Sequence, residues 1–146
     1  MRADIVILSK NYRLLSTCIA SICKHVDKKS VNRIIVGWTG PIKHEEKDIN
    51  MLGLDVTMES LDFYNFAKNN NYLVEKHCLS EAVLFMNDDV QLVEDSVTKC
   101  LGWLQQPDIG TVGIKLLYLD NTIQHAGQFV SFKDGKFAGV GHIHWK

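Results

Sequence analysis

The sequence predicts an α/β fold in which a mostly parallel central sheet is flanked by helices and followed by C-terminal β-hairpins. Up to Pro107, short apolar runs alternate with longer segments of helical periodicity, which is the order that builds a doubly wound parallel sheet. From Gly110 onward, strand-like segments are separated by turn residues at 120–121 and 134–135. Because the Asp-Gly pair at 134–135 is a strong turn signal, this region predicts antiparallel hairpins.

The composition predicts a single domain that spans residues 1–146. Lysine and arginine number 16 and aspartate and glutamate 17, giving a net charge of -1, which excludes the basic surface of a nucleic-acid-binding protein. No apolar stretch reaches the roughly 18 to 20 residues of a membrane span, so we expect no transmembrane segment and a cytoplasmic protein. The four cysteines have no CxxC spacing, which favours reduced thiols in the core.

The first elements are two strands around a helix. Residues 5–8 are wholly apolar, as expected of a strand that is covered on both faces. A helix follows over about residues 14–25, and residues 34–36 repeat the strand signal before glycines and a proline at 37–41 end it. The apolar face of this predicted helix consists of Leu14, Leu15, Cys18, Ile19, Ile22, Cys23 and Val26.

The later elements continue the alternation of helix and strand. A polar, helix-compatible stretch leads to a weak strand near residues 54–58, and the spacing of apolar residues over 66–78 predicts a helix before the strand at 83–86. The next helix is predicted to begin near Val93 or Glu94, with Glu94-Asp95 in its first turn, and to end before Pro107. The hairpin strands are predicted at 111–119, 122–132 and 136–144.

The strand at 83–86 ends in Asn87, Asp88 and Asp89. Ligands of open α/β sheets bind at the carboxyl ends of the strands, so these side chains face a site. Aspartates between a strand and a helix are also good helix caps. Two adjacent carboxylates repel each other unless a positive charge compensates, and oxygen ligands suit a hard cation such as Mg²⁺ or Mn²⁺. The pattern therefore favours a divalent metal, with capping as the alternative.

The C-terminal histidines are the second candidate for metal binding. His142 and His144 are two residues apart, so on a strand both rings lie on one face. Manganese accepts mixed carboxylate and imidazole ligation. One of these histidines could therefore join Asp89 on a common metal.

Four segments together resemble family 2 glycosyltransferases, in the order in which that family carries them. They are the strand and helix of residues 5–22, the Asn-Phe-Ala-Lys-Asn-Asn-Asn sequence of 65–71, the DXD-type Asn-Asp-Asp of 87–89, and the Gly-Thr-Val-Gly to His-Ala-Gly stretch of 110–127. This resemblance covers nearly the whole chain. It implies a GT-A fold, which is Rossmann-like, a nucleotide-sugar donor such as a UDP-sugar, a divalent metal and transfer with inversion.

The resemblance also assigns residues to roles. Ser9 and Asn11 lie in the loop that meets the nucleoside, and Lys68 lies in the helix that faces the nucleotide. Asp88 approaches the ribose or the sugar. Asp89 holds the metal that bridges the two phosphates, and His142, or else His144, takes the place of the family's later metal-binding histidine.

Two departures from the family pattern affect these roles. Trp38-Thr39-Gly40 stands where many members have an acidic residue that grips the base; Trp38 could stack on the base, or it could be an ordinary buried or surface aromatic residue. Family members also continue into an acceptor-binding part with a general base in a Glu-Asp pair, and this chain stops at Lys146. Inverting transfer needs such a base, and no residue of the sequence can be assigned to it.

Three functions agree with the sequence. The first is a metal-dependent glycosyltransferase that uses a UDP-sugar and passes the sugar to an unknown acceptor or to water. The second is a nucleotide-sugar-binding module without transferase activity, and the third is an unrelated metal-dependent phosphohydrolase with Asp88 as its nucleophile. We also expect exposed apolar surface along the hairpins of 110–144, and hypothesise a homodimer on that basis.

Overall fold

The structure, a computed structural model, describes residues 1–41 and 53–142. These residues form two compact units, Met1–Gln105 and Gln106–Lys146, and each is described by itself. The polar, helix-compatible stretch that was predicted after Pro41 falls largely outside the described residues. No described helix has the length and apolar character needed to cross a membrane.

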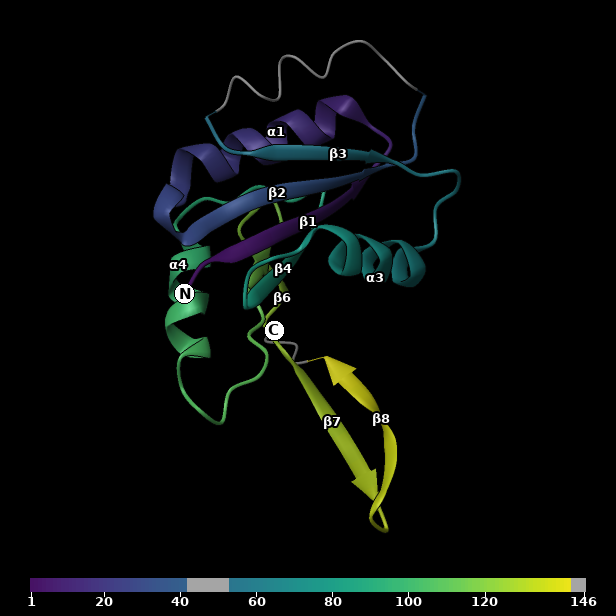
Figure 1. Cartoon of the computed structure of the whole chain (residues 1–146). Helices are drawn as coiled ribbons and strands as arrows, with labels where there is room; N and C mark the ends of the chain where they lie inside the picture. Colours follow the sequence, from purple (N-terminus) through teal and green to yellow (C-terminus); the bar gives the residue numbers. More distant parts are fainter. Residues whose placement is uncertain (42–52, 143–146) are drawn as a thin grey trace. The chain divides into compact units, whose positions relative to one another are not determined.

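The first unit contains the predicted parallel sheet. Its strands are β1 (Ala3–Ser9), β2 (Val31–Trp38), β3 (Val56–Ser60) and β4 (Ala82–Asn87). They pair in the order β3-β2-β1-β4, and every pairing is parallel (Figure 1). All seven residues of β1 are buried, so the strand with a continuous apolar run is covered on both faces, as predicted.

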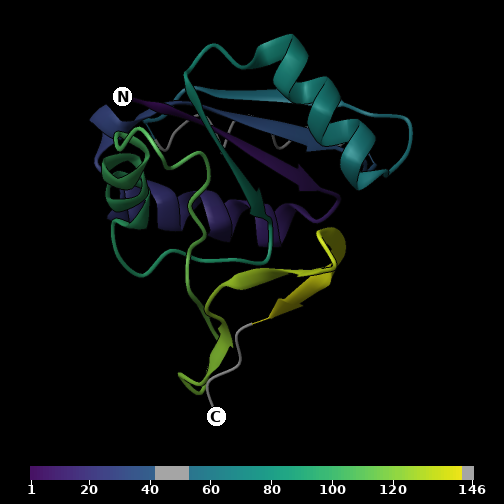
Figure 2. The ribbon, with the colours of Figure 1, turned by 90° about the horizontal axis from the view of Figure 1, so that it is seen from below.

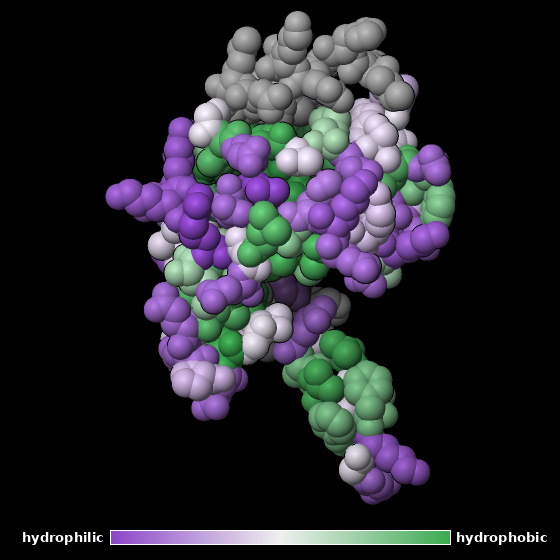
Figure 3. Space-filling view, in the orientation of Figure 1, coloured by the Kyte–Doolittle hydropathy of each residue, from purple (hydrophilic) through white to green (hydrophobic). Residues whose placement is uncertain are grey.

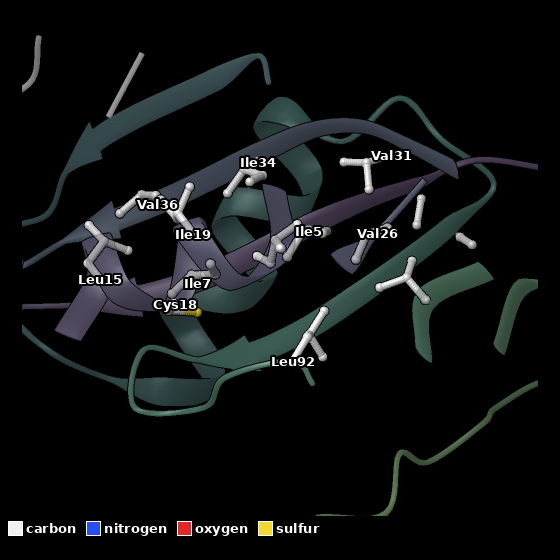
Figure 4. Packing of buried hydrophobic residues seen from close by; sticks show 14 of the residues in the cluster. Ile5, Ile7, Leu15, Cys18, Ile19, Val26, Val31, Ile34, Val36 and Leu92 are labelled. Carbon is white, nitrogen blue, oxygen red and sulfur yellow. The ribbon is translucent and has the colours of Figure 1, made fainter. Parts of the chain in front are cut away.

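Helices cover both faces of this sheet. α1 (Tyr12–His25) and α4 (Ser96–Leu104) pack on one face, and α3 (Phe66–His77) packs on the other, as the view from below shows (Figure 2). On the first face, Ile19 of α1 meets Ile7 and Ile34 of the strands within the larger hydrophobic cluster (Figure 4). On the second face, Leu73 of α3 packs with residues of β1 and β2.

The start of α1 differs slightly from the prediction. The Asn11 side chain accepts hydrogen bonds from the backbone N–H groups of Arg13 and Leu14, and an asparagine cap of this kind starts the helix at Tyr12 instead of Leu14. Leu14 was predicted to lie on the buried face, but it is 40% exposed. The reason is its position in the first turn, at the rim of a cavity and not above the core.

The start of α4 was predicted too early. Asp95 is its N-cap, because the Asp95 side chain accepts a hydrogen bond from the Thr98 N–H, and the helix begins at Ser96. Glu94-Asp95 is therefore not the acidic first turn of the helix. Val93, near which the helix was predicted to begin, precedes the helix and is exposed. The chain between Asn87 and Asp95 is consequently a longer loop than the sequence suggested.

A buried carboxylate lies near the amino end of β1, an inner strand of the sheet. Asp4 of β1 is fully buried and accepts hydrogen bonds from the backbone N–H groups of Leu79 and Ser80 and from the Asn32 side chain. Burial alone would raise the pKa of Asp4, but these hydrogen bonds favour the charged form, and the pKa lies below 3.8. Asp4 therefore ties the turn before β4 to the two central strands.

The second unit consists of short antiparallel pairs. β5 (Leu116–Leu117) pairs with β6 (Ile123–His125), and β7 (Gln128–Lys133) pairs with β8 (Lys136–His142). The strand predicted at 111–119 is reduced to two residues. The strand predicted at 122–132 is broken in two near Gly127, whose φ of 127° is unfavourable for other residues. The turn at Asp134-Gly135 is confirmed, with φ values of 52° and 73° that suit a hairpin turn.

The β7-β8 hairpin exposes large apolar side chains. The cross-strand pairs Val130 with Val140 and Phe132 with Phe137 consist of residues that are all more than half exposed, and they form part of the hydrophobic surface of the hairpin in Figure 3. This confirms the expected apolar surface. The homodimer stays a prediction.

Candidate functional site

A cavity of about 450 Å³ opens at the carboxyl ends of β1 and β4. β1 is the point at which the strand order reverses, because β2 pairs with one of its edges and β4 with the other. In open α/β sheets this switch point is where ligands bind. The cavity is lined by Leu8, Ser9, Lys10, Asn11, Leu14, Tyr64, Phe66, Asn70, Phe85, Met86, Asn87, Asp88 and Asp89.

The β1-α1 loop brings three of the predicted site residues together. The Ser9 hydroxyl donates a hydrogen bond of 2.6 Å to Oδ2 of Asp88 and accepts one of 3.1 Å from the Asn11 N–H. The Ser9 carbonyl accepts a hydrogen bond of 2.9 Å from the Thr39 N–H. Ser9 thereby links the ends of β1, β2 and β4, and it fixes the orientation of the Asp88 carboxylate at the cavity wall.

The loop after β4 carries both aspartates of the motif. Asp88 and Asp89 form a turn directly after the strand; Asp88 is half-buried and Asp89 is exposed. Because Asp95 caps α4, neither Asp88 nor Asp89 serves that helix as an N-cap. Both also line a second hollow, of about 430 Å³, together with Asn11, Arg13, Leu14, Thr17 and Gln91. The two carboxylates therefore line both hollows, and the exposed Asp89 is accessible to a ligand.

Two side chains of α1 form hydrogen bonds with the loop after β4. The Ser21 hydroxyl accepts a hydrogen bond of 3.0 Å from the Leu92 N–H and donates one of 2.7 Å to the Cys18 carbonyl. The Cys18 thiol donates to the Asn87 carbonyl at 3.6 Å. Burial, with smaller contributions from Asp88 and Asp89, raises the pKa of Cys18 to about 12, so the thiol stays protonated and can donate. Both ends of the aspartate turn are thus fixed to one helix.

Trp38 and Lys68 lie outside the lining of the cavity. Trp38 is 6% exposed, and its indole N–H donates to the Pro41 carbonyl, so the structure places it in the core. Lys68 is in the first turn of α3, where its Nζ lies 4.9 Å from the ring centre of Phe63. The binding roles given to both residues stay predictions, and the buried position of Trp38 leaves little of its ring for stacking on a base.

The predicted metal ligands fall in different parts of the chain. Asp89 is in the first unit, His142 is in β8 of the second unit, and His144 lies outside the described residues. Within residues 1–41 and 53–142, no three histidine, cysteine, aspartate or glutamate side chains form a metal-binding group. The lining of the cavity offers the carboxylate oxygens of Asp88 and Asp89 together with side-chain oxygens of serine and asparagine, a set that fits a hard divalent cation with several waters.

Comparisons with known proteins agree with this arrangement. No protein-family model matches the chain. It is 32% identical over 119 residues to y4gI, an uncharacterized protein of Sinorhizobium fredii, covering 81% of this chain and 12% of that protein. It is 34% identical over 84 residues to the O-antigen biosynthesis protein RfbC of Myxococcus xanthus, covering 57% of this chain and 6% of RfbC.

Among solved structures, the chain is similar to TarS of S. aureus, a GT-A-type glycosyltransferase. TarS superposes on 72% of this chain with a TM-score of 0.57 and 12% sequence identity, and the chain covers 20% of TarS. A structure of TarS 1-349 in complex with UDP matches with the same TM-score and 13% identity, and the chain covers 32% of it. The chain has the GT-A fold. It spans only a small part of the length of each of these relatives.

The cavity also contains candidate binding residues that were not identified from the sequence. Tyr64, Phe66 and Phe85 are each more than half exposed while they line the same cavity. Large aromatic side chains left open in one cavity are typical of a wall that receives a ring of a ligand. Phe85 precedes the aspartates on β4, and side chains alternate between the two faces of a sheet, so its position could have been read from the strand pattern.

Ser21 and Lys10 are further residues of the GT-A site that the sequence did not single out. Ser21 lies between Cys18 and Ile22 on the apolar face of α1, and a small polar residue on such a face was the available signal. Lys10 follows Ser9 in the loop. A lysine in an exposed loop carries no sequence signal of its own, and only the geometry of the cavity identifies it.

Proposed function

We propose that the chain binds a nucleotide-diphosphate sugar, such as a UDP-sugar, in this cavity together with Mn²⁺ or Mg²⁺, and that it transfers the sugar with inversion to an acceptor or to water. The observation that carries the proposal is the position of Asp88 and Asp89 in the lining of a cavity at the switch point of a GT-A fold. The UDP complex of TarS supports the choice of nucleotide.

Different residues of the cavity bind different parts of the ligand. Asp89 is exposed and available to a cation, while Asp88 is held by Ser9 and approaches the ribose or sugar. When bound, the cation stabilises the negative charge that develops on the departing diphosphate. The aromatic side chains Tyr64, Phe66 and Phe85 exclude water from one side of the ligand. We assign no general base among the residues that the structure describes.

The metal role of Asp89 is tested by calorimetry with UDP and several UDP-sugars in the presence of Mn²⁺, of Mg²⁺ and of EDTA. In the Asp89→Ala variant we expect metal-dependent affinity for UDP to fall at least about tenfold, because one carboxylate ligand to the cation is lost. Asp62→Ala, which removes an exposed carboxylate outside the lining, is the matched control. Equal affinity in EDTA, or full binding by Asp89→Ala, contradicts the role.

An assay for UDP released from UDP-sugars separates the enzyme from a binding module. Release of UDP supports glycosyltransferase chemistry, while tight binding without release supports the module. Hydrolysis of a phosphate monoester without affinity for nucleotide sugars would instead favour the phosphohydrolase.

The aromatic wall gives a second prediction. A Tyr64→Ala variant is expected to bind UDP about tenfold more weakly, since stacking on an aromatic side chain contributes about 1 to 3 kcal/mol per base. Phe63→Ala is the matched control: Phe63 is a neighbouring aromatic of similar exposure that does not line the cavity. The measurement is the Kd for UDP by calorimetry. An equal loss in both variants would show that the effect comes from the segment before α3 and not from the cavity.

A further inference from the structure

The lining of the cavity contains both aromatic and charged side chains. Tyr64, Phe66 and Phe85 supply the aromatic side chains. The charged residues of the lining are Asp88, Asp89 and Lys10. No salt bridge of Lys10 is found among the residues that the structure describes, and its side chain is exposed. A positive charge in this position is therefore available to a ligand.

The backbone of Lys10 is held on both sides. Before it, Ser9 accepts the hydrogen bond from the Thr39 N–H; after it, the Asn11 N–H is bonded to the Ser9 hydroxyl and the Asn11 side chain caps α1. Gly40 lies close against the loop, because a Cβ on Gly40 would be 2.8 Å from the Lys10 carbonyl oxygen. The base of the lysine side chain is consequently fixed at the cavity, and only its flexible end has to be ordered by a ligand.

The charges of the cavity and of the ligand favour such a contact. Two carboxylates with one divalent cation are close to neutral, whereas a nucleoside diphosphate keeps a negative charge. A lysine ammonium binds phosphate oxygens as a point charge. Aromatic side chains cannot compensate that charge, and Lys10 is the one cationic residue among the described residues that line the cavity.

We propose that Lys10 binds the diphosphate of the nucleotide directly, beside the cation that Asp89 holds. This inference rests on the proposed function and adds a phosphate-binding residue to it. If Lys10 binds the diphosphate, part of the affinity for UDP persists when EDTA removes the metal. Binding through the metal alone would not leave this part.

The experiment compares UDP and uridine by calorimetry, each with Mn²⁺ and with EDTA. In Lys10→Gln we expect the affinity for UDP to fall about tenfold in both conditions, while the affinity for uridine, which has no phosphate, stays unchanged. Lys10→Arg is expected to restore most of the affinity for UDP. Lys24→Gln removes the same charge from the last turn of α1, about 20 Å along the helix, and is expected to change nothing.

Each other result counts against the inference. Unchanged binding of UDP by Lys10→Gln, with normal binding by the unmodified chain, overturns the role of Lys10 and leaves the proposed function standing. An equal loss for uridine, or an equal loss in Lys24→Gln, shows a folding effect or a long-range charge effect and also overturns it. If the unmodified chain binds no UDP in either condition, the proposed function and this inference both fail.

Discussion

An Asp4→Ala variant is expected to lose about 3 kcal/mol of its free energy of unfolding. The Asp4 carboxylate accepts hydrogen bonds from two backbone N–H groups, of Leu79 and Ser80, and from the Asn32 side chain, in a fully buried position. Removing the acceptor leaves three partly buried donors without this partner and leaves a gap where the buried carboxylate was, and both changes are costly. Urea unfolding followed by circular dichroism measures the change.

The same carboxylate predicts how stability depends on pH. The pKa of Asp4 is lowered in the folded protein from 3.8, its value without these contacts, because the hydrogen bonds to the charged form outweigh burial. Its stabilising contribution is therefore complete above pH 3.8 and is lost as the pH falls through the lower, folded-state pKa. In Asp4→Asn this part of the acid dependence should disappear.

Asp108→Ala, which removes an exposed carboxylate, is the control for the Asp4 variant. It should change the free energy of unfolding by less than about 0.5 kcal/mol. If Asp4→Ala is as stable as Asp108→Ala, Asp4 does not hold the turn before β4 in the way that the structure indicates.

The fold could be predicted from the sequence because its strongest signals are local. Residues 5–8 are wholly apolar and lie at the centre of the sheet, and the periodicity of 14–25 matches the buried face of α1 apart from Leu14. The helix starts were less accurate, because a cap depends on one side chain: Asn11 and Asp95 fix the first residues of α1 and α4. Strand lengths in the second unit were also overestimated, since apolar residues continue through the break at Gly127.

The site was predictable only in the residues that the motifs contain. Ser9, Asn11, Asp88 and Asp89 share one cavity, as the sequence indicated. Lys68 and Trp38 carry suitable chemistry, but the direction of a side chain depends on packing, which a single sequence does not reveal. Tyr64 precedes α3, and Lys10 lies in the loop between β1 and α1. Their place in the lining follows from the fold, which puts both beside the carboxyl ends of β1 and β4, and not from a local sequence signal.

A Ser21→Ala variant is expected to show that the hydrogen bond between α1 and the loop after β4 contributes both to stability and to binding at the site. Loss of the hydroxyl leaves the N–H of Leu92 without its acceptor, and because Leu92 is buried the free energy of unfolding should fall by about 2 kcal/mol. The turn of Asp88 and Asp89 is then fixed at one end only. We expect metal-dependent affinity for UDP to fall about tenfold under conditions in which the variant is fully folded.

Ser16→Ala separates this effect from the loss of a hydroxyl on α1 in general. The Ser16 hydroxyl donates to the Arg13 carbonyl of its own helix, whereas Ser21 connects the helix to the loop that carries the aspartates. Such local bonds contribute little to stability, so Ser16→Ala should retain both its stability and its affinity for UDP. If Ser21→Ala loses stability but binds UDP with normal metal dependence, the bond to Leu92 belongs to the fold alone, and the aspartate turn is positioned by Ser9 and Cys18 without it.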